Sequence, residues 1–123
     1  MQADLSNMKD LYKGFDLIVV NNLLERTYDP AKFLAKVHER LNDGGLLVIA
    51  CTNEWREDIT AKANWIGGYK DATGENVVTL DGLASHLSGF TQIEEPVDIP
   101  FALRRQGRAY ESYVSQISFW EKQ

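Results

Sequence analysis

The clearest pattern in the first half of the chain is a pair of short apolar runs separated by a stretch with helical periodicity. Residues 15–20 (FDLIVV) and residues 46–51 (LLVIAC) are almost continuously apolar. Such runs are typical of strands that are buried on both faces of a parallel sheet. The stretch between them places four apolar residues on one helical stripe: Phe33, Leu34, Val37 and Leu41. The pattern predicts a β-α-β unit, in which a helix connects two parallel strands.

Local signals mark the limits of this unit. Asp29 and Pro30 predict the helix start, with Asp29 as N-cap and Pro30 in the first helical position. Residues 42–45 (NDGG) predict its end. Ligands of such sheets bind just past the carboxyl ends of the strands. The polar residues expected at those ends are Asn21, Asn22, Thr52 and Asn53.

The second half of the chain has weaker patterns. Residues 53–78 form a long loop-rich stretch, with a short helical candidate at residues 56–63. Long irregular stretches inside compact domains are often functional loops. Thr79 is expected to cap a short helix that ends at Gly89. The apolar face of that helix comprises Leu80, Leu83, Ala84 and Leu87.

The last third of the chain predicts two more strands. Residues 90–97 are expected to form a third strand, with a bend bracketed by Pro96 and Pro100 and a second turn at residues 106–107. Residues 109–121 are rich in aromatic and β-branched side chains, which predicts a long final strand antiparallel to the segment before it. In that strand we assign three aromatic residues to core packing and strand pairing: Tyr113, Phe119 and Trp120.

The order of elements predicts an α/β fold. It corresponds to the second half of a doubly wound, Rossmann-like sheet, mostly parallel with a reversed final strand. We therefore expect residues 1–123 to be a single partial domain that lacks the first half, where a glycine loop would bind a nucleotide. The glycine pairs at 44–45 and 67–68 do not replace that loop, because neither lies between a strand and a helix start.

The composition of the chain argues against several classes of function. The net charge of −5 argues against binding to nucleic acid or an anionic membrane. The amino terminus shows no signal peptide and no apolar run is long enough to span a bilayer, so we expect a cytoplasmic protein. Cys51 is the only cysteine, and neither His38 nor His86 has a neighbour at metal-ligand spacing. No disulfide and no metal site are expected.

Residues 15–20 paired with residues 41–49 (LNDGGLLVI) resemble the carboxyl-terminal half of a class I S-adenosylmethionine-dependent methyltransferase. The reversed final strand is similar to the antiparallel seventh strand of that family. A narrower resemblance covers nearly the whole chain. It points to the 4-mercaptohistidine N1-methyltransferase domain of ovothiol biosynthesis, and its most distinctive motif is GGYKDATGEN at residues 67–76. Its other segments are NLLER, YDP, TLDGL and DIPF.

The resemblance implies that S-adenosylmethionine is the cofactor and a thiol-bearing histidine the methyl acceptor. The segment QADLS at residues 2–6 is similar to the family segment in which an aspartate accepts a hydrogen bond from the adenine amino group. The resemblance therefore implies that Asp4, Leu5, Asn21 and Asn22 bind the cofactor, and that Asn22 lies where the methyl group and the acceptor meet. The glycine loop and the acidic ribose ligand of the family would precede Met1.

The same resemblance implies a substrate site. Glu25 and Arg26 would meet the amine and carboxylate of a histidine-like acceptor, and Arg104 is a second carboxylate ligand because its planar fork suits bidentate binding. Further candidates lie on the long loop: Trp55, Trp65, Lys70, Asp71, Glu75 and Asn76. Each also has a purely structural interpretation. These are a surface ion pair for Glu25 and Arg26, a hydrated loop for the charged residues, and packing for the tryptophans.

Two classes of function stay open. One is a methyltransferase, in which alignment and exclusion of water do most of the work because a neutral imidazole nitrogen needs no strong base. The other is a non-catalytic or split-enzyme module. The apolar edge of the first strand would then pair with a second copy or with a separate amino-terminal half. A nicotinamide-binding protein would also need the absent glycine loop, and nothing in the sequence favours it.

Overall fold

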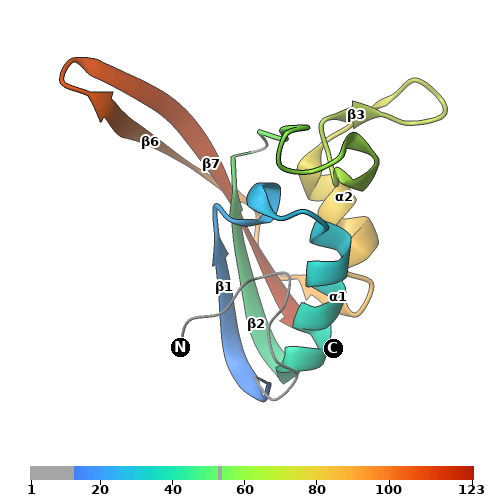
Figure 1. Cartoon of the computed structure of the whole chain (residues 1–123). Helices are drawn as coiled ribbons and strands as arrows, with labels where there is room; N and C mark the ends of the chain where they lie inside the picture. Colours follow the sequence, from blue (N-terminus) through green and yellow to red (C-terminus); the bar gives the residue numbers. More distant parts are fainter. Residues whose placement is uncertain (1–12, 53) are drawn as a thin grey trace.

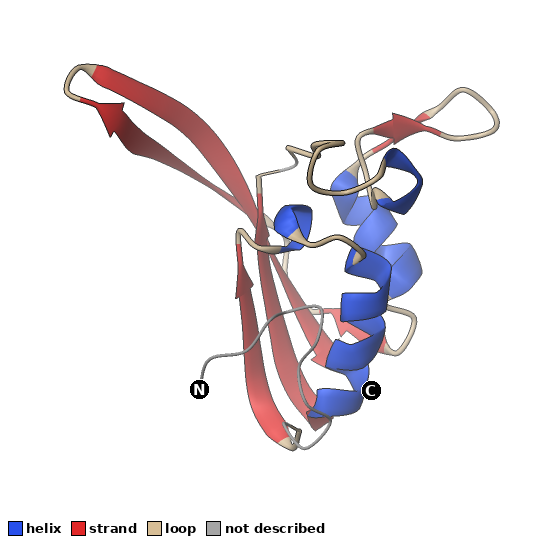
Figure 2. Ribbon diagram, in the orientation of Figure 1, coloured by secondary structure: helices blue, strands red, loops and turns tan. Residues whose placement is uncertain are grey.

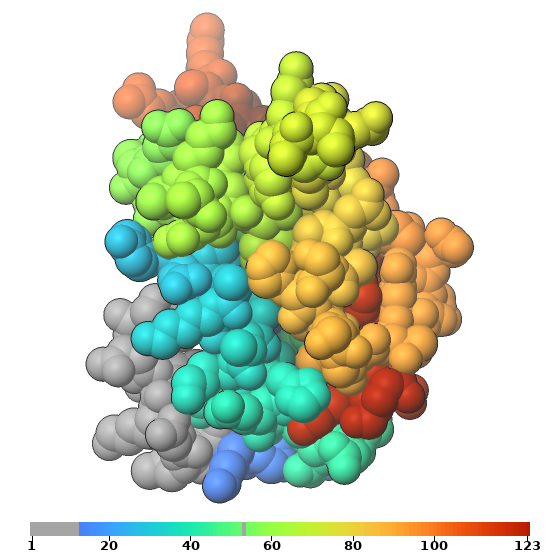
Figure 3. Space-filling view, turned by 90° about the vertical axis from the view of Figure 1, so that its right-hand side faces the viewer, coloured from blue at the N-terminus to red at the C-terminus, as the bar shows by residue number. Residues whose placement is uncertain are grey.

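The computed structural model describes residues 13–52 and 54–123. A mixed sheet forms its centre, with helices α1 (Pro30–Arg40) and α2 (Thr79–His86) on one face (Figures 1 and 2). Figure 3 looks onto this helix-covered face. The order of the sheet is β1-β2-β7-β5, and β6 also pairs with β7. The strands are β1 (Phe15–Asn21), β2 (Leu41–Cys51), β5 (Phe90–Gln92), β6 (Val97–Gln106) and β7 (Ala109–Lys122).

The predicted β-α-β unit is confirmed. Strands β1 and β2 are parallel, with Ile18 opposite Leu47 and Val20 opposite Ile49. Helix α1 starts as expected, because Pro30 is its first residue and the Asp29 side chain accepts a hydrogen bond from the Lys32 N–H at 3.2 Å.

The expected glycine-rich helix end at residues 42–45 is wrong in detail. Helix α1 ends at Arg40 and the chain turns directly into β2. Residues 42–45 belong to the start of that strand, where the register with β1 shifts between Phe15 and Leu17. Gly44 has a φ of +78° there, a conformation that glycine adopts without steric cost.

The reversed final strand is also confirmed. β7 is antiparallel to its neighbours β2, β5 and β6. The core lies between this sheet and the two helices, where burial of apolar surface supplies the main stabilisation. Its buried residues include Val20, Leu34, Val37, Leu47, Ile49, Leu83, Leu87 and Trp120.

The middle of the chain differs from expectation. Residues 56–63 do not form an α-helix: a turn at Arg56 is followed by the 3₁₀-helix η2 (Lys62–Asn64). Thr79 is the first helical residue of α2 rather than its cap, which is Val78. The Thr79 side-chain oxygen accepts a hydrogen bond from the Trp55 indole at 3.0 Å. Helix α2 ends at His86. A small hairpin of β3 (Tyr69–Lys70) and β4 (Asn76–Val77) was not anticipated.

The predicted third strand is divided. Only residues 90–92 pair with the end of β7, and the chain re-enters the sheet as β6 at Val97. Pro100 does not mark a bend but lies inside β6, opposite Val114. A proline is tolerated there because β6 pairs only with β7, which leaves its other edge without ladder partners in the described chain. The turn after Gln106 is confirmed, and the β6–β7 hairpin projects well beyond the sheet (Figure 1).

Within the described ranges, neither α-helix is long and apolar enough to cross a membrane.

Candidate functional site

Asn22 immediately follows β1 and is held in an unusual backbone conformation. Its φ is +54°, in the left-handed region that asparagine occupies more readily than most residues. Its N–H donates to the Ala50 carbonyl at 2.7 Å, which continues the contact between β1 and β2. The side-chain oxygen accepts from the Ser115 hydroxyl at 2.7 Å, and the side-chain nitrogen donates to the Asn21 side chain at 3.2 Å. The amide is therefore fixed in direction at the carboxyl edge of the sheet.

Glu25 is a buried carboxylate beside this turn. It lies in the 3₁₀-helix η1 (Leu24–Arg26) and is only 4% exposed. The Cys51 thiol donates to its Oε2 at 3.2 Å and the Thr52 hydroxyl donates to its Oε1 at 3.3 Å. Both donors come from the end of β2. The sheet edge therefore contains a buried carboxyl group that is held by hydrogen bonds from a thiol and a hydroxyl.

A polar hollow lies between η1, the segment after β2 and the β6–β7 hairpin. Thr52 belongs to its wall and is two residues beyond Ala50, the hydrogen-bond partner of Asn22. The hollow thus lies past the carboxyl ends of the two parallel strands, where open α/β sheets bind ligands. Its lining residues are Glu25, Arg26, Thr52, Glu54, Arg56, Ile59, Arg105, Glu111 and Tyr113.

The hairpin side of the hollow is an ordered cluster. Arg105 donates to Glu111 Oε2 at 2.7 Å, and the Tyr113 hydroxyl donates to the same oxygen. The hydrogen bonds from Arg105, which has the larger effect, and from Tyr113 lower the pKa of the Glu111 carboxyl. The hydrogen bond that Tyr113 makes to Glu111 raises the pKa of the Tyr113 phenol. The Tyr113 ring stacks on Phe101 with centroids 5.3 Å apart. The cluster therefore has a defined geometry although it is solvent-accessible.

The arginine in the site is Arg105 and not Arg104, which was expected there. Arg105 lines the hollow, whereas Arg104 does not: its guanidinium donates to the Gly107 carbonyl at 3.1 Å near the tip of the hairpin. Neighbouring residues of a strand point to opposite faces, so one position decides the difference. Sequence reasoning also missed Glu111 and assigned Tyr113 to core packing. Their spacing of two in a predicted strand was the available signal.

The two tryptophans pack instead of lining the polar hollow. Trp55 is buried in the core, and its indole nitrogen donates to the Thr79 hydroxyl. Trp65 is half-buried, donates to the Thr60 carbonyl at 2.8 Å and has Lys62 Nζ 5.7 Å from its ring centroid. These contacts agree with the packing interpretation of both residues.

The charged loop candidates also lie away from the hollow. Lys70, Asp71, Glu75 and Asn76 are exposed on the β3–β4 hairpin. In Figure 1 this hairpin and the β6–β7 hairpin project from the same end of the molecule in different directions. Asp71 shapes the hairpin turn, because its Oδ1 accepts from the Thr73 hydroxyl at 2.6 Å and from the Thr73 and Glu75 N–H groups. These hydrogen bonds lower the pKa of the Asp71 carboxyl, and the bond from the Thr73 hydroxyl has the largest effect.

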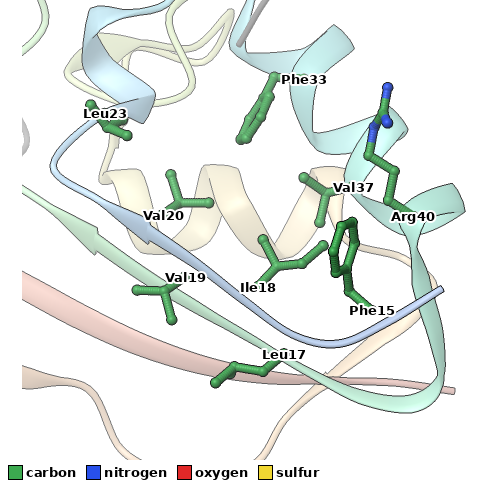
Figure 4. Close-up of a pocket in the computed structure, with 9 residues that line it drawn as sticks. All are labelled: Phe15, Leu17, Ile18, Val19, Val20, Leu23, Phe33, Val37 and Arg40. Carbon is green, nitrogen blue, oxygen red and sulfur yellow. The ribbon is translucent and has the colours of Figure 1, made fainter. Parts of the chain in front are cut away.

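A second, apolar hollow runs along β1 (Figure 4). Leu17 and Val19 of this strand are 56% and 57% exposed, although both are large apolar residues. The strand pairs only with β2 within the described ranges. The hollow is lined by Phe15, Leu17, Ile18, Val19, Val20, Leu23, Phe33, Val37 and Arg40.

Some expected site residues cannot be placed. Asp4, Leu5 and Asn53 lie outside the described residues. Among the residues that are described, no three His, Cys, Asp or Glu side chains are grouped as a metal site requires.

Two of the solved structures that are similar to this chain are methyltransferases. One is the N-methyltransferase NodS from Bradyrhizobium japonicum in complex with S-adenosyl-L-homocysteine. Its TM-score is 0.58 at 18% identity, over 98% of this chain and 52% of NodS. Another is a SAM-dependent methyltransferase from Methanosarcina mazei, with a TM-score of 0.57 at 17% identity, over 98% and 65% of the two chains.

A third similar structure comes from work on the conversion of a disulfide bond into a thioacetal group during echinomycin biosynthesis. Its TM-score is 0.60 at 12% identity, over 98% of this chain and 54% of that chain. At these identities the likeness shows the fold alone. The chain spans between about half and two thirds of the length of these three structures.

A search of curated proteins found no match. The sequence does match a protein family described as a methyltransferase domain, over residues 2–90. Together with the similar structures, this match confirms the expectation of an α/β methyltransferase fold and, at the level of the family, of S-adenosylmethionine as cofactor. The match covers well over half of the sequence, and the chain belongs to the methyltransferase domain family.

Proposed function

We propose that this chain carries the acceptor-binding part of an S-adenosylmethionine-dependent methyltransferase that methylates an imidazole nitrogen of a thiol-bearing histidine. The observation that carries the proposal is the fixed Asn22 amide at the carboxyl edge of β1 and β2, the edge from which Glu25 and Thr52 line the polar hollow. The acceptor itself is supported only by the resemblance of residues 67–76 to the ovothiol enzymes.

The residues at this edge suit the cofactor. Asn21 is exposed and its side-chain nitrogen makes no hydrogen bond within the described chain, so it can donate to a ligand. With Asn22, and with Asp4 and Leu5 from the resemblance, it would hold S-adenosylmethionine. When bound, that cofactor supplies an electrophilic methyl group.

The chain's own contribution is to bind and orient the acceptor. A neutral imidazole nitrogen has an available lone pair, so the site needs alignment and water exclusion more than a general base. In our proposal Asn22 orients the reacting groups, Glu25 binds the acceptor's amine and Arg26 its carboxylate. Glu25 suits an amine because, among the described residues, its buried carboxylate accepts hydrogen bonds from a thiol and a hydroxyl and forms no ion pair.

The test is a kinetic comparison of the wild type with Asn22→Ala, using 4-mercaptohistidine as acceptor. We expect a large loss of kcat/KM. Full activity in the variant would remove Asn22 from this role, and a wild type that methylates another acceptor but no thiol-bearing histidine would refute the acceptor.

A second candidate function is favoured by the exposed apolar edge of β1. Leu17 and Val19 are more than half exposed, and among the described residues β1 pairs only with β2. An edge strand without a second partner is a template for another chain. The chain would then be an inactive module that pairs with a second copy or with a separately made half. Calorimetry with S-adenosylmethionine on the isolated chain separates the two: micromolar binding supports an assembled cofactor site, and no binding supports the module.

A further inference from the structure

The two walls of the polar hollow come from distant parts of the sequence. One wall consists of η1 and the end of β2, with Glu25, Arg26 and Thr52. The other wall is the β6–β7 hairpin, with Arg105, Glu111 and Tyr113. A ligand in the hollow therefore contacts the sheet edge and the hairpin at once.

The charges in the hollow are not equally available to a ligand. Arg56 is occupied by Asp58, to which it donates two hydrogen bonds, at 3.1 and 2.7 Å. Arg105 is different, because its guanidinium donates from one terminal nitrogen to Glu111 and interacts with the Tyr113 hydroxyl, but makes no ion pair with a second carboxylate in the described chain. A guanidinium has five N–H donors, so Arg105 retains donors that can bind a ligand.

We propose that the β6–β7 hairpin is the carboxylate-recognition element of the acceptor site, in which Arg105 binds the carboxylate of a small amino-acid acceptor across the hollow from Glu25. The inference rests on the proposed function and adds the residues that would recognise the acceptor's backbone. Arg26, which makes no ion pair in the described chain, shares the carboxylate. The ligand class is a zwitterion, since the buried carboxyl group of Glu25 lies on one wall and the guanidinium of Arg105 on the other.

Glu111 and Tyr113 act as positioning residues in this arrangement. Glu111 accepts from both Arg105 and Tyr113 through one oxygen, which limits the directions that the guanidinium can take. The stack of Tyr113 on Phe101 holds the phenol in turn. Removing the hydroxyl alone should therefore loosen Arg105 without removing its charge.

The test compares two ligands that differ in the carboxylate. Calorimetry in the presence of S-adenosylhomocysteine measures the affinities of the full chain for L-histidine and for histamine, which lacks the carboxylate. We expect the wild type to prefer L-histidine. Arg105→Gln should reduce that preference on the order of tenfold or more, as expected for loss of a charge-assisted hydrogen bond. Arg105→Lys should restore part of it, and Tyr113→Phe should cause a smaller reduction.

Arg108→Gln is the matched control, because it removes the same charge from the exposed turn of the same hairpin. It should leave the preference unchanged. An unaltered preference in Arg105→Gln refutes the role of the hairpin while leaving the proposed function intact. If the wild type binds S-adenosylhomocysteine but neither probe, the amino-acid acceptor is wrong and both proposals fail.

Discussion

The Ser115 hydroxyl donates a 2.7 Å hydrogen bond to the side-chain oxygen of Asn22, although the two residues are 93 positions apart. The bond links the last strand of the sheet to the turn after its first strand. It orients the amide that we place where methyl donor and acceptor meet. Because Ser115 is only 4% exposed, little water competes for this contact.

Replacing Ser115 with alanine should therefore affect catalysis more than folding. Loss of one hydrogen bond is expected to lower the free energy of unfolding by about 1 kcal/mol. The freed Asn22 amide should lower kcat/KM for methylation several-fold. Ser112→Ala, at an exposed position of the same strand, is the control and should change neither quantity. Equal kinetics in the two variants would show that the bond has no role in orienting Asn22.

The positive φ of Asn22 predicts a difference between two variants that both lose the amide. Asn22→Gly keeps the backbone conformation without strain, whereas Asn22→Ala places a Cβ in the left-handed region at a cost of roughly 1–2 kcal/mol. Urea unfolding should show the glycine variant to be the more stable. Both should lose methylation to the same extent if the amide, and not the backbone, is the functional group.

Gly82 should be intolerant of substitution although it lies in a helix. A Cβ at this position would overlap the carbonyl group of Ile66, where the loop packs against α2. Gly82→Ala is therefore expected to destabilise the protein by about 1–3 kcal/mol, whereas alanine in an unobstructed helix would stabilise it. Gly107→Ala is the control, because a Cβ there meets no atom within 4 Å. The measurement is the midpoint temperature of thermal unfolding of both variants. Equal midpoints for Gly82→Ala and Gly107→Ala would contradict this packing.

The hairpin cluster predicts a pH effect. Hydrogen bonds from Arg105 and then Tyr113 lower the pKa of the Glu111 carboxyl below its ordinary value of 4.5. Their stabilising contribution is complete above pH 4.5 and is lost as the pH falls through the lowered folded-state pKa. In Arg105→Gln this pKa should rise back toward 4.5. An NMR titration of the Glu111 carboxyl measures it, and an unchanged value would mean that the ion pair does not form in solution.

Much of the fold could be predicted from the sequence. The β-α-β unit follows from local signals: two apolar runs, one helical stripe, and the Asp29–Pro30 start. The long antiparallel final strand follows from its aromatic and β-branched pattern. The region between residues 53 and 78 has no such period, and its expected helix is replaced by turns and a small hairpin.

The sequence by itself determined which residues would lie at the carboxyl ends of the parallel strands, because strand ends are visible in the pattern of apolar positions. Only the tertiary structure decided which of the polar residues share a hollow. It joins Glu25 and Arg26 to Arg105, Glu111 and Tyr113, and it turns Arg104 away. The physical reason is that the side chains of successive residues in a strand point to opposite faces of the sheet. The register of β6 on β7, including its irregularity between Arg104 and Gln106, is set by pairing across the sheet and not by local sequence.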